Sequence, residues 1–374
     1  MHLLVGNPTA QSGKNAERIH EARHLLDRHL VAHEFLSTEP DGRTVDAVAD
    51  RLRTGSFDAV IAMGGDGTFA EVGRGLLRSG IQVPLAVLPT GTANDQGKSF
   101  GMYAAHRFLE DNVRTVAAGV TVPLDAGFAT AYDVVDQVVA ADWFFDSLGW
   151  GISPKILRMR NEDRRLVGGI PILREVYRDQ LVYAGAVLRA VVQSYVEVHK
   201  FEVEVTTPEG TFFLDGLTDL ILKNTRYYAG SWILDPTASP EDGEMELVPF
   251  RGRDEWVARA VVTLDGLPVQ ELPTPLPNLS PITRAPWFEL KIFDRPGSVV
   301  EAQNDGEEWV AGMAPTTASR IWPTRISSCI RAEPAITLQT FLAGQPMLMS
   351  MIWAPLSTLW RAAWAIMAGS APAI

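Results

Sequence analysis

The stretch FDAVIAMGGDGTFAEV, Phe57 to Val72, decides the fold of this chain. An apolar, β-branched run from Phe57 to Met63 predicts a buried strand, and the pattern from Phe69 to Leu77 predicts a helix. The loop between them holds three glycines in four positions, with Asp66 as the exception. Glycine lets backbone N–H groups turn toward an anion, and the N-terminus of the next helix adds a favourable dipole. Because Asp66 would repel a phosphate unless a cation lay between them, the loop predicts phosphate binding with Mg²⁺; a tight turn without a ligand is the alternative.

Two further loops follow predicted strands in the same way. Leu3-Leu4-Val5 ends at Gly6-Asn7-Pro8, and the run from Pro84 to Leu88 ends at PTGTAND, residues 89–95. Repeated strand–turn–helix patterns predict a parallel sheet covered by helices, in which ligands bind beyond the carboxyl ends of the strands. Ser12-Gly13-Lys14 does not complete a P-loop, because six residues separate Gly6 from Gly13 and Asn15 stands where Ser or Thr would hold Mg²⁺.

Composition limits the class of protein. The chain has 374 residues, 46% of them hydrophobic and 21% charged, which is ordinary for a folded protein. A net charge of −12 argues against binding nucleic acid. The single cysteine, Cys329, excludes an intrachain disulfide and a multi-cysteine metal site. The N-terminus lacks a basic segment followed by a long apolar one, so we expect a cytoplasmic protein rather than a secreted one.

The pattern changes twice along the chain. Residues 1–125 alternate strands and helices, and we expect them to form an α/β nucleotide-binding domain. Residues 126–332 hold one helical segment, about 167–193, among short β-rich runs typical of a sandwich-like domain for the acceptor. These runs are FEVEV at 201–205, TFFLDGLTDLIL at 211–222, MELVPF at 245–250, WFELKIF at 287–293 and RIWPTRISSCI at 320–330. Residues 333–374 predict an apolar helical extension, with no charged residue from Pro334 to Trp360.

The glycine motifs, taken together, resemble those of the diacylglycerol kinase catalytic domain family, which includes bacterial lipid kinases and sphingosine kinases. The resemblance rests on NP…SG at 7–13, GGDGT at 64–68 and PTGTAND at 89–95, in this order and spacing. It continues in LKNTRYYAGSWILDPTASPEDGEMEL at 222–247 and in QNDGEEW at 303–309. NAD kinases are distant relatives of the same family. The resemblance implies a two-domain enzyme that transfers the γ-phosphoryl group of ATP to a lipid hydroxyl, with Mg²⁺ as cofactor.

Each site residue is carried over by its place in these motifs. The resemblance implies that the ATP-binding residues are Asn7, Thr38, Gly64, Gly65, Asp66, Gly67, Thr68, Thr90, Gly91, Thr92 and Asn94. It also implies that Mg²⁺ is organised, through water, by the carboxylates of Asp66, Asp95 and Asp125. A further metal site is implied at Ser239, Asp242 and the carbonyl of Glu244, for which a plain surface turn is the alternative.

Asp305 and Glu307 are the expected catalytic pair. On a strand or turn, residues i and i+2 can point the same way, so both carboxylates could reach one acceptor hydroxyl, and their closeness would raise one pKa toward neutrality. A polar hairpin turn is the alternative, because Asp-Gly favours one strongly. The sequence departs from the family after the Asn-Asp pair, where Gln96-Gly97-Lys98 follow, and at Gly230-Ser231, so the identity of the acceptor lipid stays open.

The apolar C-terminal segment has three candidate roles. With tryptophans at 353, 360 and 364 and one arginine, Arg361, it predicts a helix lying in the membrane interface, which suits a peripheral enzyme with a lipid substrate. Packing on the chain's own surface and a homodimer seam are the other two. An NAD-kinase-like phosphotransferase and a non-catalytic nucleotide-binding module at the membrane are the alternative functions.

Overall fold

The structure is a computed structural model. It describes residues 1–133, 137–154, 200–228, 230, 232–252, 255–256, 279–293, 300–309 and 316–328. The predicted helix at 167–193, Cys329 and the predicted C-terminal extension at 333–374 lie outside the described residues. Everything below concerns the part of the chain that precedes residue 332, which forms one compact unit.

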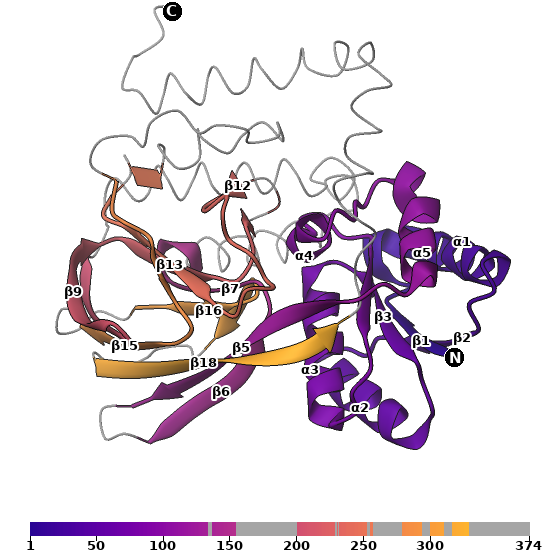
Figure 1. Cartoon of the computed structure of the whole chain (residues 1–374), viewed down its shortest axis with the longest axis horizontal. Coiled ribbons are helices and arrows are strands. Elements are labelled where there is room, and N and C mark those ends of the chain that lie inside the picture. The colour runs from indigo at the N-terminus through magenta and orange to yellow at the C-terminus, as the bar shows by residue number, and fades with distance from the viewer. Residues whose placement is uncertain are drawn as a thin grey trace, which may run out of the picture. The chain divides into compact units, whose positions relative to one another are not determined.

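A four-stranded parallel sheet forms the first part of the chain (Figure 1), in the strand order β2-β1-β3-β4. The strands are β1 (His2–Gly6), β2 (His33–Ser37), β3 (Ala59–Gly64) and β4 (Leu85–Pro89). Every residue of β3 and of β4 is buried, as expected for strands that helices cover on both faces. The predicted parallel sheet is therefore present.

Helices connect these strands. They are α1 (Lys14–Arg28), α2 (Thr44–Thr54), α3 (Asp66–Ser79), α4 (Asp95–Ser99) and α5 (Leu109–Ala118), with short 3₁₀ turns at Ala10–Gly13 and His106–Phe108. α1 leads from β1 outward to β2, whereas α2 and α3 lead in the opposite direction along the sheet. Because such crossovers are right-handed, α1 covers one face of the sheet and α2 and α3 cover the other. The point where this direction reverses, between β1 and β3, is where α/β sheets bind ligands.

The remaining strands form two six-stranded antiparallel sheets. One has the order β14-β13-β10-β7-β16-β17, and the other has the order β6-β5-β18-β15-β8-β9. The first comprises β7 (Ser147–Gly151), β10 (Asp219–Lys223), β13 (Met245–Phe250), β14 (Thr283–Ala285), β16 (Ala302–Asn304) and β17 (Glu307–Trp309). The second comprises β5 (Val122–Tyr132), β6 (Val138–Phe144), β8 (Phe201–Thr207), β9 (Gly210–Leu217), β15 (Phe288–Phe293) and β18 (Thr316–Ser328). A small ladder joins β11 (Tyr227–Tyr228) to β12 (Trp232–Ile233).

Two large hydrophobic cores, and a small third cluster around Phe250, lie in the described part of the chain. One lies around the parallel sheet, and a second takes residues from both antiparallel sheets, such as Phe288 of β15 and Leu222 of β10. Strand β5 serves both cores: Leu124 and Ala126 are buried in the first, and Ala129 and Ala131 in the second. The predicted boundary at residue 125 thus falls inside a continuous strand, which ties the two cores together.

Candidate active site

The predicted glycine loops meet at the carboxyl edge of the parallel sheet. The backbone N–H of Thr38 donates to the carbonyl of Gly6 over 3.0 Å, and that of Thr90 donates to the carbonyl of Gly64 over 2.8 Å. These bonds bring the residues that follow all four strands to one edge, Asn7 among them. The Asn7 side chain accepts hydrogen bonds from the backbone N–H and the hydroxyl of Thr9, so it caps its own turn.

Two of these loops touch through glycine. A Cβ built on Gly91 would lie 2.4 Å from the Cα of Gly65, a distance that no real side chain tolerates. Asn94, at φ 55°, holds this approach in place, because its side chain accepts from the N–H of Gly91 and donates to the carbonyl of the same residue. A Cβ on Gly67 would instead meet nothing closer than the Glu307 carboxylate, at 3.9 Å. Gly67 therefore leaves open space beside the first turn of α3.

Thr68 and Thr92 complete the predicted phosphate loop. The side chain of Thr68 lies over Gly64, where a Cβ would come within 2.4 Å of it. Thr92 is exposed, whereas Thr90 is buried. The loop thus offers one exposed hydroxyl and an open glycine on its outer side.

Asp66 and Asp95 lie close enough to affect each other's ionisation. Burial and then the charge of Asp146 raise the pKa of Asp66. Burial, followed by the charges of Asp66 and Asp146, raises the pKa of Asp95 to about 8. Asp66 accepts the backbone N–H of Gln96 at 3.1 Å, and Asp95 accepts that of Gly230 at 2.9 Å. The charge of the half-buried Asp66 therefore disfavours the ionised form of the buried Asp95.

Asp305 and Gly306 form a two-residue hairpin turn between β16 and β17, with φ 48° and 81°. Because both residues are left-handed, Asp305 and Glu307 stand on a turn, the second of the two settings expected for the pair. The Asp305 carboxylate points into the protein and accepts the backbone N–H groups of Phe145, Asp146 and Ser147 at 2.7–3.1 Å. The backbone at 305–306 is thus the hairpin turn that the alternative predicted. The Asp305 carboxylate, however, is buried against three backbone N–H groups, which a plain surface turn does not provide.

Arg74 of α3 connects this turn to the first part of the chain. Its guanidinium donates to the carbonyl of Trp143 and to the side chain of Asn304, both at 3.0 Å, and lies 3.7 Å from the Asp305 carboxylate. Burial raises the pKa of Asp305 to about 6, with Arg74 lowering that pKa and Asp146 raising it. A carboxylate of this kind changes protonation near neutral pH.

A pocket of about 530 Å³ adjoins the turn. Gly67 and Glu71 of α3, Arg74, Trp143, Asp305 and Glu307 are among its lining residues. Glu307 is exposed, in contrast to the buried Asp305. The open glycine of the phosphate loop and the predicted catalytic pair therefore border the same space.

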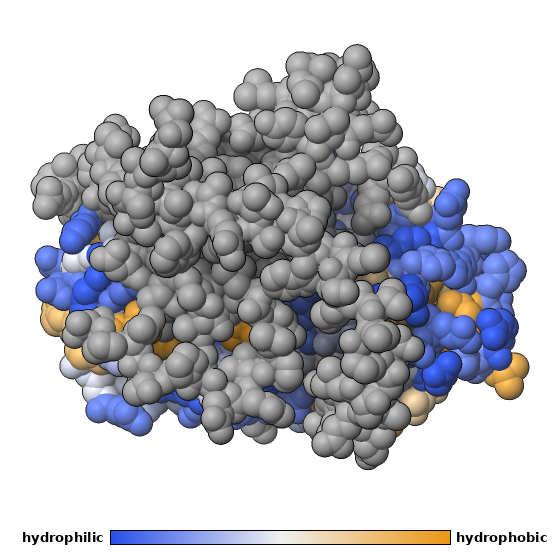
Figure 2. Space-filling view, turned by 90° about the horizontal axis from the view of Figure 1, so that it is seen from above, coloured by the Kyte–Doolittle hydropathy of each residue, from blue (hydrophilic) through white to orange (hydrophobic). Residues whose placement is uncertain are grey.

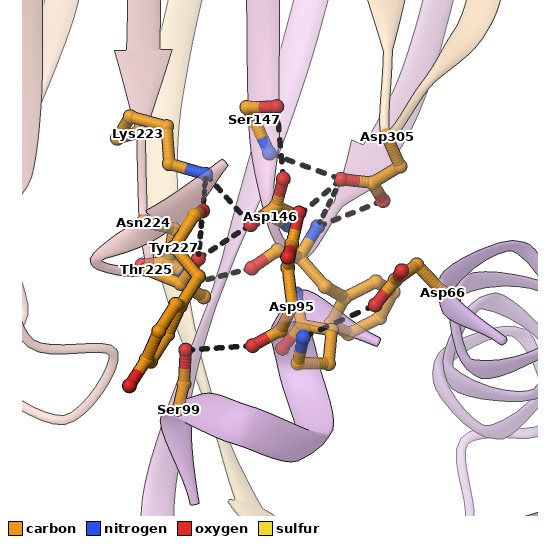
Figure 3. A network of polar contacts seen from close by, with 12 residues as sticks. Asp66, Asp95, Ser99, Asp146, Ser147, Lys223, Asn224, Thr225, Tyr227 and Asp305 are labelled. Atoms are coloured by element: carbon orange, nitrogen blue, oxygen red, sulfur yellow. Dashed lines mark hydrogen bonds and ion pairs between the residues drawn. The ribbon is translucent and has the colours of Figure 1, made fainter. Parts of the chain in front are cut away.

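Asp146 lies at the centre of the polar network in Figure 3, between Lys223 and Asp305. The fully buried Lys223 donates to its carboxylate at 2.7 Å, and the hydroxyl of Thr225 donates to the same oxygen. Neither Asp146 nor Lys223 is among the site residues predicted from the sequence. The available signal was a charge within or at the end of an apolar run: Asp146 stands in WFFDSLGW at 143–150, and Lys223 ends DLILK at 219–223.

The remaining predicted metal ligands lie elsewhere. The Asp125 carboxylate accepts the N–H of Gly243 at 2.5 Å, and its own N–H donates to the carbonyl of Pro240. In the same loop, Asp242 accepts the N–H of Glu244 and Ser239 accepts that of Glu241, as in local turns. Among the residues that the structure describes, no group of three or more His, Cys, Asp or Glu side chains is placed to hold a metal ion directly. Metal binding at 239–244, and at Asp125 through water, stays a prediction.

The two departures from the family pattern contact each other. Lys98 donates to the carbonyl of Gly230, and the N–H of Gly230 donates to Asp95. Gly230 has φ 86°, and a Cβ there would meet Ala93 at 3.1 Å. Both the N–H and the carbonyl of Gly230 are thus hydrogen-bonded to side chains of α4.

Glycine loops at the carboxyl edge of a parallel sheet, backed by buried carboxylates, are typical of α/β proteins that bind phosphate groups. Residues 1–129 match the family profile of the diacylglycerol kinase catalytic domain. This match confirms, over residues 1–129, the family resemblance seen in the sequence.

Curated relatives carry corresponding names. A probable lipid kinase YegS-like of Pseudomonas aeruginosa is 26% identical over 263 residues, which cover 68% of this chain and 72% of the relative. A diacylglycerol kinase of Bacillus subtilis is 28% identical over 228 residues, covering 59% and 72%.

Solved structures share the fold. A diacylglycerol kinase from Bacillus anthracis superposes with a TM-score of 0.59 at 16% identity, covering 88% of this chain and 96% of that one. Yeast NADH kinase complexed with NADH has a TM-score of 0.51 at 12% identity, with 94% and 89% covered. The expected order of an α/β part followed by a β-rich part is confirmed.

Proposed function

We propose that this protein is a lipid kinase that transfers the γ-phosphoryl group of ATP to a lipid hydroxyl. The observation that carries the proposal is one shared space: the open glycine beside α3, Asp305 and Glu307 border the same pocket. In phosphoryl transfer, catalysis consists mainly of positioning and of neutralising charge, and this arrangement provides for both.

The triphosphate lies, in this proposal, along Gly65 to Thr68 and against Gly91 and Thr92. Asp66 and Asp95 fit Mg²⁺ on one observation: the charge of the half-buried Asp66 helps to raise the pKa of the buried Asp95, and a divalent cation bound through water would relieve that repulsion. The cation would neutralise charge on the phosphate oxygens. The residues of the chain would orient the nucleotide and exclude water.

Asp305 serves as the general base. Its pKa, raised to about 6 by burial, leaves it ionised at neutral pH yet able to take a proton from the acceptor hydroxyl. The hydroxyl oxygen then attacks the γ-phosphorus in line, and ADP leaves. Glu307, exposed at the same pocket, is the second member of the pair and a candidate to receive the proton in turn.

The acceptor is an amphiphile such as diacylglycerol or a sphingoid base, so the enzyme works at a membrane surface from the cytoplasmic side. In the described part of the chain, no helix is long and apolar enough to cross a membrane. The proposed attachment is therefore peripheral.

The test is a phosphotransfer assay with γ-³²P-labelled ATP and Mg²⁺ on a total lipid extract, followed by separation of the labelled product. NAD is assayed in parallel as the acceptor. A labelled lipid supports the proposal. Label on NAD alone would replace it with an NAD-kinase-like function, and label on neither would leave a nucleotide-binding module without catalysis.

A further inference from the structure

The ion pair between Asp146 and Lys223 is a buried contact that the proposed mechanism does not use. Lys223 has no exposed surface, and besides Asp146 its ammonium donates to the carbonyl of Tyr227 at 2.5 Å. The second carboxylate oxygen of Asp146 accepts the hydroxyl of Ser147 at 3.1 Å. Both charges are thus fixed by several partners.

The loop that contains Asp146 also holds the Asp305 carboxylate in place. Three consecutive backbone N–H groups, those of Phe145, Asp146 and Ser147, point at its carboxylate (Figure 3), and the N–H of Asp305 donates back to the carbonyl of Ser147 at 2.9 Å. On its other side, the loop is fixed by Asn224, whose backbone N–H donates to the carbonyl of Asp146 and whose side chain donates to that of Phe145. A shift of the Asp146 side chain would therefore move the amides around Asp305.

Stability alone gives little reason for this pair. Two charges lose their hydration when buried, and apolar residues of similar volume are often as stable or more so. Lys223 ends a strand whose residues Leu220, Ile221 and Leu222 are all fully buried, so an apolar residue would suit the same position. What an apolar pair would not supply is a fixed negative charge next to Asp305.

We propose that the Asp146–Lys223 ion pair is a positioning element for Asp305, which fixes the three-amide cradle and places a negative charge beside that carboxylate. This inference rests on the proposed function, in which Asp305 is the base. Asp146 does not touch the substrate; it acts through the cradle and through its charge.

Other charged groups face the same region and set the background. Arg74 and Asp66 come from α3, Asp95 and Lys98 from α4, and Glu307 from β17. Arg74 lowers the pKa of Asp305 and Asp146 raises it, although burial is the largest cause. Replacing Asp146 by a neutral residue should therefore lower the pKa of Asp305 and weaken it as a base.

The experiment compares Asp146→Asn, Lys223→Met and the double variant in the full chain. Each single variant leaves one buried charge unpaired, so its urea midpoint should fall, whereas the double variant should recover the wild-type midpoint. Asp146→Asn and the double variant should both shift the acid limb of the kcat–pH profile to lower pH by about one unit. Both should also lower kcat by roughly tenfold, with the KM for ATP little changed.

Asp219→Asn is the matched control. Asp219 is also a fully buried carboxylate, lies on the same strand as Lys223, and bonds to Ser153. Its replacement should change the urea midpoint and leave the acid limb in place. If the double variant recovers both the midpoint and the wild-type kcat–pH profile, or if Asp219→Asn shifts the limb equally, the pair is only structural and the proposal is wrong.

A measurement that does not depend on enzyme activity separates this inference from the proposed function. The Asp305 carboxyl, observed by NMR in aspartate-labelled protein, should titrate at lower pH in the double variant than in the wild type. An unchanged titration would overturn the inference even if lipid kinase activity is found. A shifted titration would uphold the effect of Asp146 even if no lipid is phosphorylated, in which case only the proposed function fails.

Discussion

Glycine has two different roles in the phosphate loops. Gly91 is required by the protein itself, because any Cβ there would strike the backbone of Gly65. Gly67 is required by nothing in the described part of the chain, since its Cβ would have 3.9 Å to the nearest atom. Sequence alone could not separate these roles, because both glycines stand in similar loops after buried strands.

Gly67→Ala is therefore the cleanest test of the phosphate loop. The position lies in the first turn of α3, where Ala is favourable, so the free energy of unfolding should not fall. If a phosphate lies against Gly67, the added methyl group should weaken ATP binding by about tenfold, or about 1.4 kcal/mol. Calorimetric titration with ATP and Mg²⁺ measures this.

The contrasting variant is Gly91→Ala, which should lower the urea midpoint whether or not ATP is present. Unchanged ATP affinity in Gly67→Ala would mean that the triphosphate lies elsewhere.

Asp305→Asn should reduce kcat by about 10²- to 10⁴-fold, because the amide cannot take the proton from the acceptor. It should also cost some stability, since the amide nitrogen cannot accept the N–H groups that the carboxylate now accepts. Thermal stabilisation by ATP and Mg²⁺ should persist, because the proposed phosphate contacts belong to α3 and the loop at Gly91.

Glu307→Gln is the companion variant, because Glu307 is exposed and its replacement should not disturb the fold. We expect a smaller loss of kcat than for Asp305→Asn. Near-full turnover in both variants would remove 303–309 from the chemistry and make Asp66 the leading candidate for the base.

At the scale of single residues, the sequence indicated those site residues that stand together in one short motif. Gly64 to Thr68 and Asp305 to Glu307 were visible as short motifs. Asp146 and Lys223 were not, because 77 residues separate them and their meaning depends on two strands that pair only in the fold. A charge inside an apolar run is a weak signal until its partner is known.

At the scale of secondary-structure elements, periodicity was a reliable guide. In β8, burial alternates along FEVEVTT as the alternating sequence predicts, and the uniformly apolar β3 is buried throughout. The hairpin at Asp305-Gly306 shows where the rule of alternating side chains no longer applies. Alternation holds on a strand, and the two positive φ angles place the predicted catalytic pair on a turn instead.

Asp219, the first residue of β10, should make the stability of the fold depend on pH. Burial raises the pKa of Asp219 from its ordinary value of 3.8 to about 7 in the folded protein, despite hydrogen bonds from Ser153. A raised pKa means that the fold binds the proton more tightly than the unfolded chain does. This contribution to stability is fully present below about pH 4 and is lost as the pH rises through about 7, by at most about 1.4 kcal/mol per pH unit.

Asp219→Asn removes this dependence. Relative to the wild type, the free energy of unfolding of the variant should therefore improve between pH 5 and pH 8, as measured by urea denaturation at both values. A difference between the two proteins that does not change with pH would show that Asp219 has an ordinary pKa in the fold.

At the scale of the whole molecule, the question is how a lipid substrate reaches the site. On the side of α1 and α5, Figure 2 shows a mainly hydrophilic surface with isolated hydrophobic side chains. The exposed large hydrophobic residues of the described part are scattered, at Met1, Leu30, Ile81, Val120, Val138, Val139 and Phe213. Single exposed apolar residues are normal on a protein surface, so this side does not indicate membrane binding.

The proposed membrane contact belongs to the apolar segment that the sequence predicts at 333–374. Deleting residues 332–374 leaves every described residue of the candidate site in place, because these all precede residue 332. We expect the truncated protein to phosphorylate a short-chain lipid in detergent with a kcat within about twofold of the full chain. Its activity on bilayer vesicles should fall by at least about tenfold, and it should no longer sediment with them, because the tryptophans proposed to lie in the membrane interface are gone. If the truncated protein is insoluble, or if it stays soluble and still binds vesicles, then the C-terminal segment belongs to the fold or to a dimer seam, and the membrane contact lies elsewhere.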